Sequence, residues 1–239
     1  DERQSSMFEL TPLESEALGL SLRVGFWAVL GSLPLGLFVA WLLVRVEFPG
    51  RTIVNGLVHL PLVLPPVVVG YLLLVLLGRN GPVGSLFYDW FGWTFAFTWQ
   101  GATIASAVVA FPLMVRSIRL GLELVDRRLE TAARTLGATR LDAFWTVTVP
   151  LVLPGILTGA VLAFARSIGE FGATITFVSN IPGQTQTLPL ALYTVTQSPG
   201  GDQAALRLVL ISCILAFAAL AASELLARHV KRRLLGGSA

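Results

Sequence analysis

The sequence predicts an all-α integral membrane protein with five transmembrane helices, and three observations support this fold class. Of 239 residues, 54% are hydrophobic and 13% are charged, and the mean hydropathy is +0.75, too apolar for an ordinary soluble domain. Five stretches are long and apolar enough to cross a hydrocarbon core about 30 Å thick, which takes a helix of about 20 residues. Lys and Arg flank these stretches unevenly, which indicates an orientation.

The five predicted spans belong to a single transmembrane domain, residues 1–239. Their approximate bounds are 17–44, 53–77, 98–120, 149–178 and 204–227. Proline is expected to break the helix at Pro34 in the first span and at Pro61, Pro65 and Pro66 in the second. Because broken backbone at membrane depth must be satisfied by protein or water, the second span is expected to face the bundle or a pathway. A kinked helix that faces lipid is the alternative.

Basic residues next to the spans predict the topology. One side of the membrane holds Arg45, Arg51, Arg116, Arg119, Arg127, Arg128, Arg134, Arg140, Arg228, Lys231, Arg232 and Arg233. The other side holds Arg3, Arg79 and Arg207. The positive-inside rule therefore predicts a periplasmic N-terminus, a cytoplasmic C-terminus and a cytoplasmic segment from 121 to 148. Met7 is expected to be the natural start, with no signal peptide.

Two outer segments have distinct compositions. Residues 78–99 form an outer loop rich in Phe, Tyr and Trp, which are expected to anchor at the lipid headgroups, with ligand stacking as the alternative. Residues 179–203 are polar, and their ALYTV core is expected to form a short interfacial helix that offers a landing surface to an external protein. No cofactor or metal site is expected, because His59 has no cluster of other ligands and Cys213 is the single cysteine.

The cytoplasmic segment begins with a predicted short amphipathic helix. Asp126 is placed to cap it, and Glu130 and Arg134 have the i,i+4 spacing of an ion pair. Its apolar face is expected to consist of Leu129, Ala132, Ala133 and Leu136.

A break follows this helix. Gly137 is placed to end it in a left-handed turn, and Thr139 with Asp142 forms a capping box that opens a second short helix through Trp145. A helix lying on anionic lipid is the alternative, but such a helix needs no break at Gly137. The segment is therefore interpreted as a docking element for a partner.

The same residues resemble a known signature. Ala132 and Ala133, then Gly137 after three residues and Val147 to Pro150 after nine more, resemble the EAA motif of permease subunits of binding-protein-dependent bacterial ABC importers. In that family the loop forms a coupling helix that docks into a cytoplasmic ATPase. Thr131 stands where the family has its Glu, with Glu130 one residue earlier. The resemblance implies ATPase-coupling roles for Glu130, Thr131, Ala132, Ala133, Arg134, Gly137, Ala138 and Asp142.

A longer resemblance covers most of the chain. Residues 59–79, 111–123, 132–138 and 162–183 are similar to bacterial molybdate permeases. The resemblance implies a homodimer in the bacterial inner membrane, two cytoplasmic ATP-binding subunits and a periplasmic molybdate-binding protein. It also implies alternating access for molybdate or tungstate, with sulfate, thiosulfate and phosphate as alternative substrates.

The fourth span carries an intramembrane pair of opposite charges, Arg166 and Glu170, spaced to lie on one face of a helix. Two roles are open for this pair: it locks the helix to a neighbouring helix, or it takes part in gating. Further candidates for the lining of a pathway are Ser167, Thr174, Thr176, Ser179 and Asn180.

The chain itself lacks the means to hydrolyse ATP. It has no G-x-x-x-x-G-K-[ST] motif, and Lys231 is its single lysine, so an ATPase partner is expected and the chain is not expected to be an enzyme. The basic residues sit beside membrane spans, so no nucleic acid is expected as a partner. The rival class is a self-sufficient membrane protein, namely a channel, a secondary transporter or a membrane-embedded enzyme, but the spans show few titratable residues and no evident inverted repeat.

Overall fold

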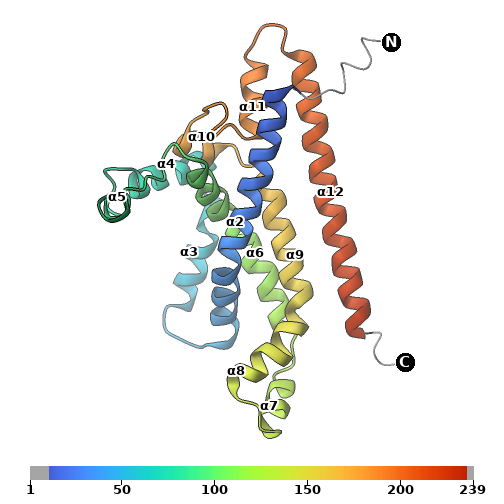
Figure 1. Ribbon diagram of the computed structural model, residues 1–239. Helices are drawn as coiled ribbons and strands as arrows, with labels where there is room; N and C mark the ends of the chain where they lie inside the picture. The colour runs from blue at the N-terminus through green and yellow to red at the C-terminus, as the bar shows by residue number, and fades with distance from the viewer. Residues whose placement is uncertain (1–10, 236–239) are drawn as a thin grey trace.

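The computed structural model describes residues 11–235, and every regular element in that range is a helix (Figure 1). Arg3 and Met7 lie outside the described residues. Three long helices form the centre: α2 (Pro12–Arg45), α6 (Trp99–Glu123) and α9 (Val149–Ile168). α12 (Asp202–Leu235) stands along the outside of this group, against α9 (Figure 1). The core that joins the centre includes Leu43, Met114 and Val152.

Four helical stretches are long and apolar enough to cross a membrane: 12–45, 99–123, 140–168 and 202–222. A bent pair, α3 (Arg51–Val63) and α4 (Pro66–Leu77), meets the same test when its two helices are taken together, and would make a fifth span. All five apolar stretches of the sequence are therefore helical. α2 begins at the end of the molecule opposite to the one where α12 ends (Figure 1).

α2 is longer than the predicted first span and is not broken. Thr11 and Glu14 form a capping box at its start, with Pro12 at the first helical position. The break expected at Pro34 is wrong, because the helix continues through that residue to Arg45. A proline removes only one backbone hydrogen bond, and here Ser32 before it and Gly36 after it both contact Met114 of α6, which holds the helix on both sides of the proline.

The second apolar stretch is broken at the predicted proline pair. α3 ends at Val63, α4 begins at Pro66, and the two helices are bent by 115°. Leu64 and Pro65 are extended because a residue that precedes proline avoids the helical region. Pro61 does not break α3, which continues for two more residues.

The fourth apolar stretch, predicted as a single span over 149–178, is also broken. α9 ends at Ile168, and α10 (Gly172–Val178) begins after a short irregular segment that contains Gly169. α10 packs against α4, so the two broken stretches meet. The prediction of one continuous helix is wrong here because α10 packs closely on α4, an approach that Gly172 permits, since a Cβ at this position would lie 2.8 Å from Pro66.

Two short helices lie outside the central group: α11 near the start of α2, and α5 projecting to the side beyond α4 (Figure 1). α11 (Leu188–Thr196) contains the ALYTV core, which confirms the short helix expected there. α5 (Gly84–Phe91) lies within the aromatic segment that was expected to be a loop, and its Trp90 is 78% exposed. Aromatic ring contacts between Phe87, Phe91 and Phe95 stabilise this segment as a helix and turn.

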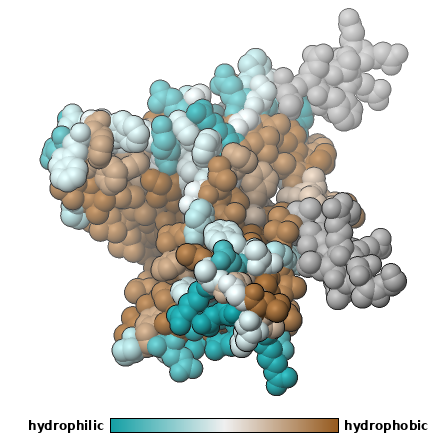
Figure 2. All heavy atoms as spheres, turned by 60° about the horizontal axis from the view of Figure 1, so that its bottom comes forward, coloured by the Kyte–Doolittle hydropathy of each residue, from teal (hydrophilic) through white to brown (hydrophobic). Residues whose placement is uncertain are grey.

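The predicted docking segment lies at the opposite end. α7 (Arg127–Thr135) is followed by α8 (Arg140–Ala143), and a π-helical turn (Phe144–Thr148) joins α8 to α9 without a break. The expected separate helix ending near Trp145 is therefore wrong, because the π-helical turn continues α8 directly into α9. Figure 2 shows hydrophilic residues at this end of the molecule and hydrophobic residues over its flanks.

Candidate functional site

The docking segment exposes most of its surface. Asp126 caps α7 by accepting a hydrogen bond from the backbone of Arg128, as predicted. The helix contains no buried residue, and Leu129 and Leu136 on its predicted apolar face are 47% and 89% exposed. An apolar face left uncovered at a hydrophilic end of a membrane protein is suited to contact with another protein.

The break after α7 has the predicted geometry. Gly137 has a φ of 98°, in the left-handed region that favours glycine, and a side chain there would meet no other atom within 4 Å. Thr139 and Asp142 form the predicted capping box at the start of α8. The two helices are therefore set at a fixed turn by backbone conformation and capping alone.

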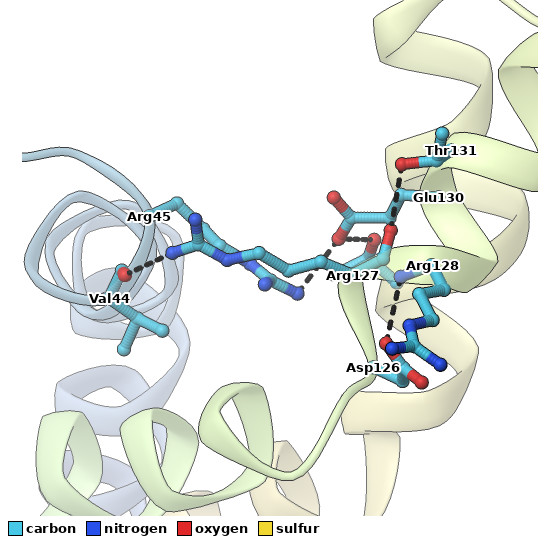
Figure 3. A network of polar contacts seen from close by, with 8 residues as sticks. Val44, Arg45, Asp126, Arg127, Arg128, Glu130 and Thr131 are labelled. Carbon is cyan, nitrogen blue, oxygen red and sulfur yellow. Dashed lines mark hydrogen bonds and ion pairs between the residues drawn. The ribbon is translucent and has the colours of Figure 1, made fainter.

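Glu130 fastens α7 to two other elements (Figure 3). Its Oε1 atom lies 2.9 Å from Nη2 of Arg45, the last residue of α2, and accepts a 2.7 Å hydrogen bond from the hydroxyl of Thr148 in the π-helical turn. Arg45 is 9% exposed and Glu130 is 30% exposed, so this is a partly buried pair. The expected pairing of Glu130 with Arg134 is replaced by these contacts.

A second contact joins the same two helices. Arg127 donates a 3.2 Å hydrogen bond to the backbone carbonyl of Val44, at the C-terminal end of α2 (Figure 3). The hydroxyl of Thr131, at the position of the signature acid, bonds to the Arg127 carbonyl of its own helix. Arg127 and Glu130 therefore both connect α7 to the end of α2, and Glu130 also connects it to Thr148 just before α9.

Arg45 and Thr148 are partners of Glu130 that the sequence did not indicate. They lie 85 and 18 residues from Glu130 in the chain. Arg45 was interpreted only as a marker of orientation, and Thr148 only as part of the signature. Their shared contact depends on how α2 and α9 pack, which no local pattern encodes.

The remaining predicted coupling residues stay on the surface or near it. Ala132, Arg134 and Gly137 are exposed, and Ala133 and Ala138 are half-buried. Asp142 is exposed, and its carboxylate is engaged by Thr139.

The intramembrane charge pair forms, but not on one continuous helix. Nη1 of Arg166 lies 2.7 Å from Oε2 of Glu170, although α9 ends between them at Ile168. The other carboxylate oxygen of Glu170 accepts a 2.8 Å hydrogen bond from the backbone of Ala173 at the start of α10. The side chain of Glu170 is 1% exposed and that of Arg166 is 30% exposed, so Glu170 holds together the two halves of the broken span.

The other pathway candidates surround this break. Ser167 is buried and its hydroxyl has no hydrogen-bond partner among the described residues, while the Thr174 hydroxyl bonds to backbone carbonyls of Glu170 and Phe171. Thr176, Ser179 and Asn180 are half-buried, and Asn180 donates a hydrogen bond to Thr194 of α11. The structure thus brings the candidates to one region.

Close backbone contacts hold this region against α4. A methyl group added at Gly70 would lie 2.5 Å from the carbonyl oxygen of Ala173, and one added at Gly172 would lie 2.8 Å from Pro66. Real side chains do not tolerate such distances, so α10 and α4 can approach only at glycine. No group of three or more His, Cys, Asp or Glu residues that could hold a metal occurs among residues 11–235 that the structure describes.

Comparisons with known proteins agree with these features. The family model described as "binding-protein-dependent transport system inner membrane component" matches residues 32–235. The chain is 62% identical over 224 residues to the molybdenum transport system permease protein ModB of Escherichia coli strain K12, covering 94% of this chain and 98% of that protein. It is 56% identical over 226 residues to ModB of Haemophilus influenzae, covering 95% and 99%.

A solved structure shows the same fold. The crystal structure of a bacterial ABC transporter involved in the import of the acidic polysaccharide alginate superimposes with a TM-score of 0.73 at 17% identity, covering 95% of this chain and 83% of that one. The exposed docking segment and the broken spans are consistent with these matches. The chain belongs to the family of inner membrane components of binding-protein-dependent transport systems.

Proposed function

We propose that this chain is the permease subunit of an ATP-driven importer that moves molybdate, and its congener tungstate, across the bacterial inner membrane. The observation that carries the proposal is the similarity to molybdenum transport permeases over nearly the whole chain. Residues 1–239 act as one transmembrane domain with five spans, a periplasmic N-terminus and a cytoplasmic C-terminus. The bent pair α3–α4 counts as one of the five spans.

The partners follow from the same proposal. Two copies of the chain form a homodimer around a central cavity, two cytoplasmic ATP-binding subunits hydrolyse ATP, and a periplasmic molybdate-binding protein delivers the anion. α7, Gly137 and α8 dock into the ATP-binding subunit, with Leu129 and Leu136 supplying apolar contacts. The Glu130 carboxylate holds the docking helix to the membrane domain rather than reaching the partner.

Transport proceeds by alternating access. Closure of the ATP-binding subunits moves α7, and the contacts of Glu130 and Arg127 transmit the movement to α2 and α9. A dianion does not cross hydrocarbon bare, so the cavity between the two copies must be wet and lined by polar groups that bind it weakly. Candidates for this lining or for its gate are Arg166, Ser167, Glu170, Thr174, Thr176, Ser179 and Asn180.

Reconstitution tests the proposal. The permease, purified together with its ATP-binding subunit, should take up radiolabelled molybdate into proteoliposomes only when ATP and the loaded binding protein are both present. Tungstate should compete with molybdate, whereas sulfate, thiosulfate and phosphate should compete weakly or not at all. Uptake that proceeds without ATP would instead identify a channel or a secondary transporter.

A further inference from the structure

An open cavity of about 230 Å³ lies between α3 and α6, outside the regions described so far. It lies at the end of the molecule that carries the docking segment. Arg116 is seven residues before the end of α6, about 10 Å along the helix, and Asn55 is four residues after the start of α3, about 6 Å. The cavity is lined by Asn55, His59, Arg116, Arg119, Leu120 and Glu123.

The polar groups of this cavity are arranged as hydrogen-bond donors. Arg119 donates to the side-chain oxygen of Asn55 at 3.0 Å and to Glu123 at 2.9 Å, which fixes its guanidinium in place. Asn55 therefore keeps its NH₂ group for another partner. His59 Nδ1 lies 2.8 Å from the backbone carbonyl oxygen of Asn55, which can only accept, so this nitrogen carries the proton and donates to it.

Arg116 supplies a charge without a counter-ion. It is exposed, lines the cavity, and has no hydrogen-bond or ion-pair partner among the described residues. Glu123, the one carboxylate of the lining, is already paired with Arg119. The cavity therefore has a net positive charge and free donors, which are the features that recognise a tetrahedral oxyanion.

The same features indicate weak binding. The cavity is open, and its volume of about 230 Å³ accommodates a small oxyanion with part of its water, since one water occupies about 30 Å³. Glu123 reduces the local positive charge, and the Arg119 side chain is 31% exposed. Passage through a pathway requires contacts strong enough for entry and weak enough for release.

We infer that Arg116, Arg119 and Asn55 form a transient oxyanion site at the inner mouth of the pathway, which the transported anion contacts on leaving the membrane domain. The inference rests on the proposed function and adds to it a specific exit site. The phosphate of an anionic lipid headgroup has the same chemistry, so the test must separate a lipid phosphate from the transported anion.

The experiment uses the complete transporter in proteoliposomes with ATP in the lumen and radiolabelled molybdate and binding protein outside. The variants are Arg116→Gln, Arg116→Lys and Arg51→Gln. Arg51 opens α3 on the same side and does not line the cavity, so its replacement removes an equal charge elsewhere. Each variant is measured in phosphatidylcholine alone and in phosphatidylcholine mixed with phosphatidylglycerol.

We expect Arg116→Gln to lower the maximal uptake rate about tenfold or more in both lipid mixtures, because a charge-assisted contact contributes about 1.5–3 kcal/mol and about 1.4 kcal/mol corresponds to tenfold. The apparent KM for the loaded binding protein should stay unchanged, because docking occurs at the opposite face. Arg51→Gln should remain within about twofold of the wild type, because Arg51 lies outside the cavity. Arg116→Lys should fall between Arg116→Gln and the wild type, because lysine restores the charge but not the several donors of the guanidinium.

Two results would overturn the inference while leaving the proposed function intact. Either Arg116→Gln matches Arg51→Gln, or its defect appears only with phosphatidylglycerol, which would make a lipid headgroup the ligand. A wild-type transporter without ATP-dependent molybdate uptake would overturn the proposed function itself, and the exit site with it. Because Arg116 is exposed and contacts no described acceptor, its variants should assemble normally, which size-exclusion chromatography checks.

Discussion

The Nη2 atom of Arg45, at the C-terminal end of α2, lies 2.9 Å from Oε1 of Glu130 in the docking helix α7. The same carboxylate oxygen accepts the hydroxyl of Thr148, just before α9. One side chain thus joins three elements that are distant in sequence. These contacts restrict how far α7 can move without α2 and α9.

Replacing Glu130 should uncouple ATP hydrolysis from transport. Glu130→Gln removes the ion pair with Arg45 while keeping an oxygen for Thr148, and a hydrogen bond to a charged group contributes about 1.5–3 kcal/mol. We expect the ratio of molybdate taken up to ATP hydrolysed to fall about fivefold. The control is Glu47→Gln, an exposed acid shortly after the end of α2. An unchanged ratio in Glu130→Gln would show that the contact carries no movement.

Gly137 should be required for docking rather than for folding. Gly137 and Gly92 both have positive φ, 98° and 68°, and both face open space, so a side chain strains the backbone in each by about 1–2 kcal/mol. Gly137→Val should abolish most coupled uptake by changing the angle between α7 and α8. Gly92→Val, on the other side of the molecule, should cost similar thermal stability and leave uptake near normal. Equal uptake by the two variants would contradict the docking role.

Gly70 should be essential for the packing of the two broken spans. A Cβ at this position would lie 2.5 Å from the Ala173 carbonyl oxygen and 2.9 Å from the Ala173 Cα, both backbone atoms that cannot move aside cheaply. Overpacking of this kind costs about 1–3 kcal/mol, so Gly70→Ala should lower the Tm by several degrees. Gly56→Ala in α3 has nothing within 4 Å and should leave the Tm unchanged or raise it. Thermal unfolding in detergent measures both variants.

Neutralising Arg166 should lower the stability of the fold more than neutralising Glu170. Arg166→Gln leaves the buried Glu170 carboxylate without its counter-ion, which costs about 3–5 kcal/mol. Glu170→Gln leaves an arginine that is 30% exposed and reaches water, so its cost should be smaller. The double variant should resemble Glu170→Gln. Equal stabilities of Arg166→Gln and the wild type would show that the pair has no structural role.

The sequence predicted the helical class and the docking segment well because both depend on local signals. Hydrophobic length alone located the five apolar stretches. Capping by Asp126, the left-handed turn at Gly137 and the Thr139–Asp142 box are confirmed, since each involves residues within three positions of one another. The break at Pro65 and Pro66 is confirmed for the same reason.

The predictions of where a helix breaks are wrong at two places where contacts with a neighbouring helix decide the outcome. Pro34 was expected to break its helix, yet packing against α6 holds α2 continuous; the fourth span was expected to be continuous, yet α10 turns to lie on α4. Proline and glycine only lower the cost of a break. Whether a break occurs depends on the neighbouring helix.

By itself the sequence determined that this chain is helical and apolar enough for a membrane, and that a capped helix, a glycine turn and a second capping box follow one another between residues 126 and 142. Only the tertiary structure decided that Glu130 pairs with Arg45, that Glu170 bridges a broken span and that Arg116, Arg119 and Asn55 line one cavity. Capping hydrogen bonds join residues a few positions apart, and the apolar length of a span is continuous in the sequence, so both can be recognised without the fold. Side-chain partners on different helices are set by how those helices pack, which brings together groups as far apart in the chain as Arg45 and Glu130, separated by 85 residues.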